Sequence, residues 1–316
     1  MPELPEVEHL RRSLDPWIVG ARIAALRVVR RGVVELAPGE RRDDEAFARA
    51  LGVGSTIVRT RRLGKQMAVE LSSGRVFIVQ LGMTGSLTIE AGAGPRGVEA
   101  RHRHVRWEIV PRNALPIASV DADGRARSAR LVFRDPRRFG GLVAYASMRD
   151  LETAWSRLGP DALDVGTDVL GDQLAGSKRP LKAALLDQSV LAGVGNIYAD
   201  ESLHAAGIHP LVPAGGLARD AVARLAAELR RILGAAVERG GSTLRDYRDA
   251  FGQPGSAVQI HRVYGRAGQP CLACGCTLLG TVVQARTTVF CPQCQDLSTF
   301  LNHSPASKAR GASAGR

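Results

Sequence analysis

The sequence has 316 residues, 45% of them hydrophobic, which is enough for roughly two domains with a packed core in each. Its 43 lysines and arginines outnumber its 31 aspartates and glutamates, and the net charge of +12 favours a nucleic-acid partner, although an arginine-rich coding bias would give the same balance. No run of 18 apolar residues is present and the N-terminus is acidic, so neither a transmembrane helix nor a secretory signal is predicted. The chain is expected to be cytoplasmic.

The chain is predicted to begin with a helix over residues 5–17, in which apolar side chains recur at helical spacing, at Val7, Leu10 and Leu14. Removal of the initiator methionine would expose the secondary amine of Pro2 beside Glu3 and Glu6. The partial positive charge of a helix start would help to keep that amine unprotonated. Such an amine can attack an electrophilic sugar carbon and form an iminium. From these residues alone, the alternative is that the prolines only initiate the helix and the acids complement its dipole.

The segment from Arg22 to Tyr145 is predicted to be mostly β. Short apolar runs alternate with turns, and Ser-Ser-Gly at residues 72–74 indicates a hairpin. Two stretches without a core pattern, residues 91–100 and 113–128, are predicted to be surface loops.

The pattern becomes helical after residue 148. A short apolar segment, LKAALLDQ, leads into a glycine-flanked turn, and helices are predicted from Ile197 to about Ala206 and from Leu217 to about Arg239. Residues after Leu297 are polar, small and basic and are predicted to be a disordered tail. These changes of pattern predict domains at residues 2–147, 148–262 and 263–297, with the tail at 298–316.

Four of the five cysteines form two CxxC pairs separated by sixteen residues, Cys271 with Cys274 and Cys291 with Cys294. This spacing is typical of two knuckles around one tetrahedral, structural Zn²⁺ ion. Cys276 could compete with Cys274, but the symmetric pairs are favoured. Between the pairs, TVVQARTTVF alternates like a β-hairpin and would present an arginine on a rigid support. The alternative is a purely structural zinc ribbon whose arginine is solvated.

Five segments, in order, resemble the formamidopyrimidine-DNA glycosylase family. They are MPELPEVE at the N-terminus, QLGMTGSL, DPRRFGG, LLDQSVLAGVGNIYADE, and VYGRAGQPC with ARTTVFCPQCQ, together covering residues 2 to about 297. The resemblance implies an α+β fold: an N-terminal β-sandwich flanked by helices, then a helical domain with a helix-two-turn-helix and a β-hairpin zinc finger. It further implies a monomeric glycosylase and abasic-site lyase that excises oxidised purines from double-stranded DNA in base excision repair.

The resemblance also implies the catalytic residues. Pro2 would attack C1′ of the damaged nucleoside, Glu3 would protonate the sugar ring oxygen, and Glu6 would support the site. Lys65 resembles a lysine that contacts a phosphate near the lesion. The base would first be extruded, which costs a few kcal/mol. The iminium on Pro2 would then lead to β- and δ-elimination without a redox cofactor or a catalytic metal.

Six further residues are implied to contact DNA. Asn196 and Arg286 would hold phosphates that flank the flipped nucleotide, and Asn196 follows two glycines at the start of a predicted helix, where backbone N–H groups also point at an anion. His104 would be a further contact. A flexible thioether, a guanidinium fork and an aromatic wedge would fill the space left by the extruded base; these belong to Met83, Arg137 and Phe139.

The sequence departs from the family pattern at three places. Gln80 stands where a histidine is expected, the loop at 113–128 is longer than usual, and the tail has no family role. The nearest alternative is the endonuclease VIII-like branch, which prefers oxidised pyrimidines, but its members usually begin PEGPE and lack the methionine, arginine and phenylalanine trio. A non-catalytic zinc protein that binds damaged DNA is disfavoured by the presence of Pro2, Glu3 and Lys65.

Overall fold

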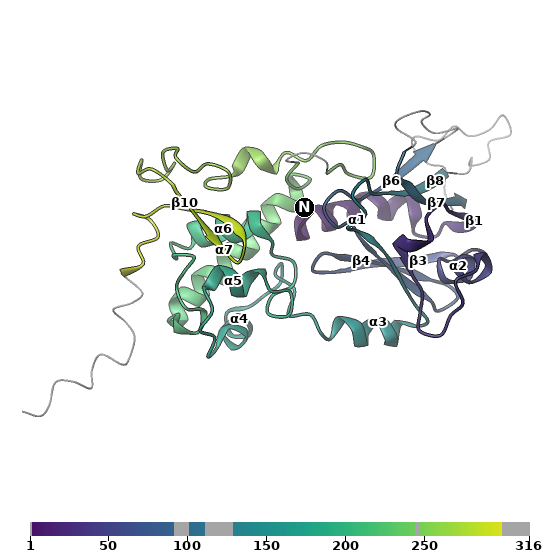
Figure 1. Cartoon of the computed structure of the whole chain (residues 1–316), viewed down its shortest axis with the longest axis horizontal. Helices are drawn as coiled ribbons and strands as arrows, with labels where there is room; N and C mark the ends of the chain where they lie inside the picture. Colours follow the sequence, from purple (N-terminus) through teal and green to yellow (C-terminus); the bar gives the residue numbers. More distant parts are fainter. Residues whose placement is uncertain (1, 92–100, 111–128, 244–246, 299–316) are drawn as a thin grey trace, which may run out of the picture. The chain divides into compact units, whose positions relative to one another are not determined.

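The computed structural model describes residues 2–91, 101–110, 129–243 and 247–298, which fall into two compact units (Figure 1). Unit 1 comprises Met1–Arg157 and Ala235–Gln259, and unit 2 comprises Leu158–Gly234 and Ile260–Arg316. The predicted loop at 113–128 lies outside the described residues, as do the predicted loop at 91–100 apart from residue 91 and the predicted tail at 298–316 apart from Ser298. The domain boundaries drawn from the sequence therefore stay predictions.

Unit 1 contains two β-sheets. The first has the strand order β1-β7-β8-β6 and is antiparallel throughout; its strands are β1 Arg22–Val28, β6 Ser86–Ala91, β7 Arg103–Val110 and β8 Ala129–Arg134. The second has the order β2-β9-β5-β4-β3; its strands are β2 Val34–Glu35, β3 Ile57–Leu63, β4 Gln66–Leu71, β5 Val76–Gln80 and β9 Gly141–Tyr145. Only the short β2–β9 pair is parallel in this sheet. The predicted hairpin at residues 72–74 joins β4 to β5.

One apolar core joins the two sheets and the first helix, α1 Leu4–Ile18. The predicted helical face, Val7, Leu10 and Leu14, is at most 1% exposed. Trp107 of the first sheet stacks on Phe77 of the second, with ring centroids 5.6 Å apart. Two shorter helices, α2 Asp44–Ala50 and α3 Met148–Trp155, and the 3-10 turn η1 Arg31–Val33 complete the described part of this region.

Unit 2 is helical and ends in a small hairpin. Its helices are α4 Thr167–Leu174, α5 Leu181–Leu186, α6 Asn196–Ala205 and α7 Arg219–Glu238, with 3-10 turns η3 Ala214–Gly216 and η4 Ala257–Ile260. The last residues of α7 and most of η4 are counted with unit 1. The hairpin pairs β10 Leu279–Val283 with β11 Arg286–Phe290. The α+β fold class and the helices predicted around residues 197–206 and 217–239 are confirmed.

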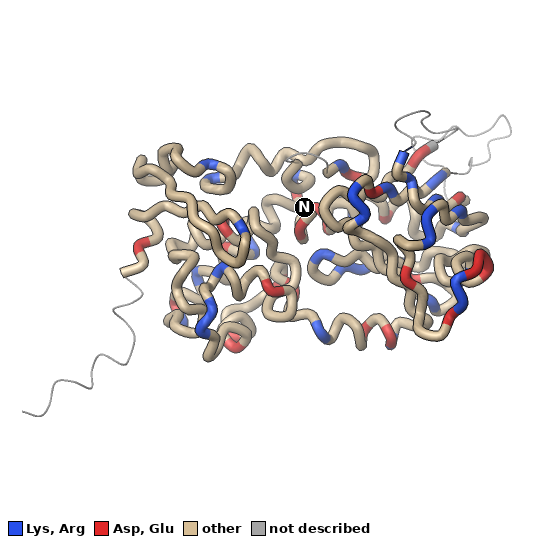
Figure 2. Tube along the Cα trace, viewed as in Figure 1, with Lys and Arg blue, Asp and Glu red and all other residues tan. Residues whose placement is uncertain are grey.

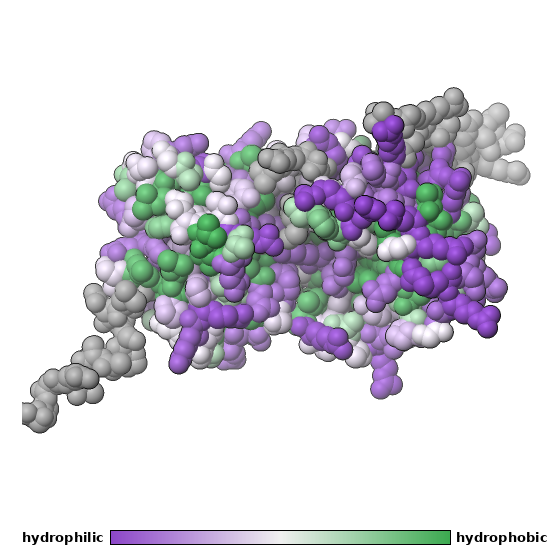
Figure 3. Space-filling model, viewed as in Figure 1, coloured by the Kyte–Doolittle hydropathy of each residue, from purple (hydrophilic) through white to green (hydrophobic). Residues whose placement is uncertain are grey.

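The surface of each unit is mainly hydrophilic in the view of Figure 3, with apolar side chains scattered among polar ones. Among the described residues, no helix is long and apolar enough to cross a membrane. Strand β6 and helices α2, α3 and α4 were not predicted from the sequence, because their apolar residues are few or their length is short.

Candidate functional site

The N-terminal turn of unit 1 is buried and held by its own acids. Pro2 is buried and Glu3, the N-cap of α1, is only 2% exposed. The backbone N–H of Glu3 donates to Oε2 of Glu6 at 2.7 Å, which is one half of a capping box. The predicted nucleophile therefore precedes a residue whose backbone is fixed by a carboxylate one helical turn away.

The other carboxylate oxygen of Glu6 connects α1 to a distant segment. Oε1 accepts the backbone N–H of Ser242 at 2.6 Å, and the carbonyl oxygen of Glu6 accepts the hydroxyl of Tyr247 at 2.9 Å. Burial, followed by the charges of Glu6 and Asp249, raises the pKa of Tyr247, so the hydroxyl stays protonated and remains a donor. Gly241 lies at φ +76°, and a Cβ there would sit 2.7 Å from Cγ of Glu6. Only glycine allows this approach.

Lys65 lies in the tight turn between β3 and β4. Leu63 pairs with Gln66, and Gly64 between them adopts φ +56°, a conformation that favours glycine. Figure 2 shows several basic residues along this hairpin. Because α1 packs on β3 and β4, the structure places the predicted catalytic lysine on the element next to the helix that carries Pro2 and Glu3.

Met83, Arg137 and Phe139 lie on two loops that are clamped together. Met83 is 37% and Phe139 is 59% exposed, and the guanidinium carbon of Arg137 lies 4.8 Å from the centroid of the Phe139 ring. The fully buried carboxylate of Asp135 accepts the hydroxyl of Thr84 at 2.5 Å. It also accepts the backbone N–H groups of Arg137 and Gly140, at 3.2 and 2.7 Å. The sequence analysis did not single out this aspartate, although it begins the DPRRFGG motif.

His104, a predicted DNA contact, lies inside the fold next to Asp135. It is only 6% exposed, and its Nε2 lies 2.8 Å from the carbonyl oxygen of Asp135. The pairing of β7 with β8 shifts register between Arg103 and Val105, so His104 occupies an irregular position of the strand. His102 is exposed, adopts φ +63°, and its carbonyl accepts the N–H of Asp135. The sequence pattern contains no signal for this shift.

In unit 2, Asn196 binds the backbone of the residue that follows Arg286. Asn196 is the first residue of α6, and its Nδ2 donates to the carbonyl oxygen of Thr287 at 2.9 Å. Arg286, the exposed first residue of β11, precedes that peptide. Oδ1 of Asn196 is buried and accepts no hydrogen bond from the described residues. The start of α6 is thus bound to the residue that follows Arg286 in the hairpin, and an amide and a guanidinium are both groups suited to an anion.

A buried ion pair, missed in the sequence analysis, supports this junction. Lys182 is 0% exposed, and its Nζ lies 2.7 Å from Asp200, 2.8 Å from the Thr288 hydroxyl and 3.1 Å from the Thr287 carbonyl. Asp200 also accepts the N–H of Val289 at 3.1 Å. Burial raises the pKa of Asp200 to about 6, although the charge of Lys182 opposes that rise. The pair fastens β11 to helices α5 and α6.

The four predicted cysteines come together, and their thiol sulfurs all lie within 4.8 Å of one another; they are Cys271, Cys274, Cys291 and Cys294. Two Sγ–Sγ distances, 3.4 Å for Cys274 to Cys291 and 4.0 Å for Cys271 to Cys294, bracket the roughly 3.8 Å edge of a tetrahedron with 2.3 Å metal–sulfur bonds. Backbone N–H groups of Ala273 and Cys294 point at two of the sulfurs, at 3.4 Å each. Cys276 is outside this cluster. The donor set fits a tetrahedral thiophilic metal ion.

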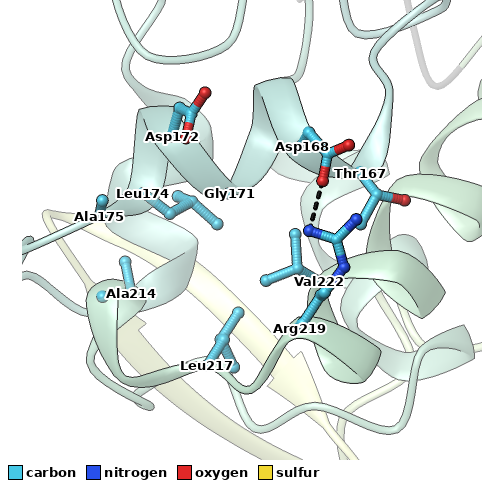
Figure 4. A pocket seen from close by; sticks show the side chains of 11 residues that line it. Thr167, Asp168, Gly171, Asp172, Leu174, Ala175, Ala214, Leu217, Arg219 and Val222 are labelled. Atoms are coloured by element: carbon cyan, nitrogen blue, oxygen red, sulfur yellow. Dashed lines mark ion pairs between the residues drawn. The ribbon is translucent and has the colours of Figure 1, made fainter.

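A separate cavity of about 280 Å³ lies in unit 2 between α4, η3 and the start of α7 (Figure 4). Asp168 and Arg219 form an ion pair at its side, and both side chains are mostly exposed. Apolar side chains, including Leu174, Leu217 and Val222, line the rest. The described residues that line this cavity include none of the predicted site residues.

Comparison with known proteins finds similarity along most of the chain. A family model described as formamidopyrimidine-DNA glycosylase N-terminal domain matches residues 1–142, and one described as formamidopyrimidine-DNA glycosylase H2TH domain matches residues 158–248. A formamidopyrimidine-DNA glycosylase from Thermomicrobium roseum is 41% identical, over 94% of this chain and all of the relative.

Two solved structures show the same fold with DNA bound. One is a Lactococcus lactis FPG mutant in complex with DNA that contains Fapy-dG; it is 29% identical, with a TM-score of 0.78 over 93% of this chain and 100% of that one. The other is a MutM protein in complex with DNA that contains carbocyclic 8-oxo-G, with the same identity, TM-score and coverage.

Proposed function

The chain belongs to the formamidopyrimidine-DNA glycosylase family and is a DNA-repair glycosylase, and from this premise we propose that it excises oxidised purines, 8-oxoguanine and formamidopyrimidines, from duplex DNA and then cleaves the abasic site. The observation that carries this proposal is the buried N-terminal turn, in which Glu6 anchors the backbone of Glu3 directly after Pro2. The DNA complexes of the two relatives support the purine substrates.

The chemistry is assigned to the N-terminal turn. After removal of Met1, the nitrogen of Pro2 attacks C1′, the glycosidic bond breaks, and the base leaves with the electron pair of that bond and takes up the proton that Pro2 loses. Glu3 gives a proton to the ring oxygen as the C1′–O4′ bond breaks. The opened sugar stays attached to Pro2 as an iminium. Loss of the C2′ proton expels the 3′ phosphate, a second elimination expels the 5′ phosphate, and water then releases Pro2. Lys65 holds a phosphate near the lesion.

The exposed residues of both units bind the DNA. Met83 and the stacked pair of Arg137 and Phe139 fill the space of the extruded base. The hydrogen bonds of Asp135 hold the loops that carry these side chains together. Asn196 and Arg286 hold phosphates that flank the flipped nucleotide. His104 contributes through Asp135 rather than by direct contact.

The four clustered cysteines hold one structural Zn²⁺, which fixes the ends of the β10–β11 hairpin. Zinc supplies no step of the reaction. The small core of this module contains Val263, Leu278 and Val289 with two of the cysteines, and so few apolar side chains need a metal to stay folded. We assign the monomer as the active form and residues 2–147, 148–262 and 263–297 as its functional segments.

Borohydride reduction during turnover tests the proposal. It should trap the iminium as a stable protein–DNA adduct, and peptide mapping should place the sugar remnant on Pro2. Glu3→Gln keeps the amine but removes the acid, so base release should fall roughly 10²- to 10⁴-fold while DNA affinity changes little.

The matched control carries a bulky residue at position 2, so that Met1 is retained. It should bind DNA normally and give no adduct. Normal cleavage of lesion DNA by this control would show that another residue, such as Lys65, is the nucleophile. Excision of oxidised pyrimidines in preference to purines would refute the substrate assignment.

A further inference from the structure

One buried guanidinium connects helix α1 to the Lys65 turn. Arg62, near the end of β3, has a side chain that is only 6% exposed. Its Nε donates to Oε2 of Glu8 at 2.9 Å, and one of its terminal nitrogens donates to the carbonyl oxygen of Gly64 at 3.1 Å. The fork of a single arginine therefore holds a carboxylate of α1 and the peptide immediately before Lys65. A lysine, with its single ammonium group, does not offer this geometry.

The carboxylate at the other end of this connection, that of Glu8, is charged at neutral pH. Glu8 is 6% exposed and is bound by Arg11 and Arg12 as well as by Arg62. Burial alone would raise the pKa of Glu8, but hydrogen bonds from Arg11 and Arg12 and the charges of Arg11 and Arg62 outweigh it and lower the pKa to about 2. The attachment to α1 is thus ionic throughout the physiological range.

The residue after Lys65 is tied down separately. Oε1 of Gln66 accepts the indole N–H of Trp155 at 2.8 Å, and Trp155 ends helix α3. The turn is therefore held by side chains on both sides, in addition to the backbone pairing of the hairpin. Because apolar packing can often replace a buried ion pair without loss of stability, fixing the shape of the turn is a better account of Arg62 than stability is.

We infer that Arg62 is a positioning residue for Lys65, which it fixes relative to the helix that carries Pro2. This inference rests on the proposed function, in which Lys65 contacts a phosphate and Pro2 attacks a sugar carbon. Because the side chain of Arg62 is buried, it acts through Glu8 and Gly64 and not by touching DNA. Contacts within unit 1 thus run from Glu8 through Arg62 to Gly64 and its neighbour Lys65.

Equilibrium binding of the full-length protein to lesion duplex at several salt concentrations tests the inference. Lys65→Met should flatten the slope of log K against log salt by about one unit, the loss of one phosphate contact. Arg62→Met should lose most of the same unit, and the double variant should lose no more than Lys65→Met alone. Losses that add would show that Arg62 acts independently and would overturn the inference.

Glu8→Gln separates positioning from simple charge. This change makes the protein more positive by one, so long-range electrostatics predicts tighter DNA binding, whereas a released turn predicts weaker binding and a flatter slope. Arg59→Met is the matched control, because Arg59 lies on the same strand but pairs with Glu70 away from the turn. In the Arg59→Met background, the losses of salt slope caused by Arg62→Met and by Lys65→Met should still not add.

Arg62→Lys distinguishes a positioning effect from a folding defect, because lysine keeps the positive charge and lacks only the forked guanidinium. Its slope of log K against log salt should resemble that of Arg62→Met. A wild-type slope for Arg62→Lys, or tighter binding by Glu8→Gln, would overturn the inference. An unchanged slope for Lys65→Met would do so too. The proposed function is scored separately by the adduct on Pro2, which the natural protein and the control Arg59→Met should both form.

Discussion

The three acids near the N-terminus, Glu3, Glu6 and Glu8, are all at least nine-tenths buried, yet their surroundings differ. Glu6 receives backbone amides at both oxygens, and Glu8 receives arginine side chains. Burial of a carboxylate is costly unless such donors compensate it. The partners of Glu6 and Glu8 therefore define structural roles, and the acid next to Pro2 is the one assigned to proton transfer.

Gly241→Ala tests the anchoring of Glu6. The new Cβ would meet the side chain of Glu6 at 2.7 Å and would occupy φ +76°, so we expect a loss of stability beyond the strain of a left-handed alanine, which is about 1–2 kcal/mol. The rate of adduct formation on Pro2 should fall as well, because the collision displaces the acceptor of the Glu3 amide.

Gly252→Ala is the matched control for this change. Gly252 has φ +81° in the same unit, and a Cβ there meets no atom within 4 Å. In urea unfolding followed by tryptophan fluorescence, this variant should show only the loss of stability caused by backbone strain. Its adduct formation on Pro2 should be normal. Equal effects of the two substitutions would mean that Glu6 does not depend on Gly241.

At the scale of elements, the β10–β11 hairpin is held at its open end and along strand β11. The cysteine cluster holds its open end, and Lys182 with Asp200 holds β11 against α5 and α6. Asn196 contacts the hairpin at Thr287, next to Arg286, although the two segments are far apart in the sequence. The phosphate contacts proposed for Asn196 and Arg286 would thus depend on the packing of the hairpin as well as on these two side chains.

Lys182→Met should loosen β11. It leaves the carboxylate of Asp200 buried without its cation, a defect that typically costs about 3–5 kcal/mol, and the peptide containing Val289 should exchange its amide hydrogens faster. Because protonation neutralises the stranded carboxylate, the defect should shrink as pH falls from 8 to 5. The double variant Lys182→Met with Asp200→Asn should recover much of the protection. A double variant that exchanges as fast as the single one would contradict this account.

The sequence predicted the parts of the site that depend on local pattern. The CxxC spacing indicated the cysteine cluster, and the apolar periodicity indicated α1 and α7, whereas the enzymatic function and most site residues came from the resemblance to a family. The Lys182 contact to the hairpin spans 105 residues and could not be found from spacing. The inward placement of His104 follows from a register shift between two strands, which depends on pairing and not on residue type.

At the scale of the whole molecule, a net charge of +12 must be reconciled with folding as well as with DNA binding. Part of the positive charge is paired with carboxylates inside the protein, since Arg11, Arg12 and Arg62 all bind Glu8. As pH falls, carboxylates are protonated, such pairs are lost and self-repulsion grows. Acid stability is therefore a measure of how much the fold depends on these buried pairs.

Glu8→Gln should remove a defined part of that acid dependence. The folded pKa of Glu8, about 2, lies below its ordinary value of 4.5, so Glu8 stabilises the fold above pH 4.5 and this contribution disappears as pH falls from 4.5 towards 2. The shift corresponds to a loss on the order of 3 kcal/mol. All three tryptophans lie in unit 1, at positions 17, 107 and 155, so fluorescence-detected urea unfolding at pH 7 and pH 3 reports this unit.

The variant should be less stable than the natural protein at pH 7 and should lose much less stability between pH 7 and pH 3. Glu45→Gln is the control, because Glu45 is 88% exposed and pairs with an exposed arginine, where ion pairs contribute little. Its pH dependence should match that of the natural protein. If Glu8→Gln retained the full pH dependence, the acid sensitivity of unit 1 would have to reside in other carboxylates, and the arginine cluster around Glu8 would not be the element that holds α1 to β3.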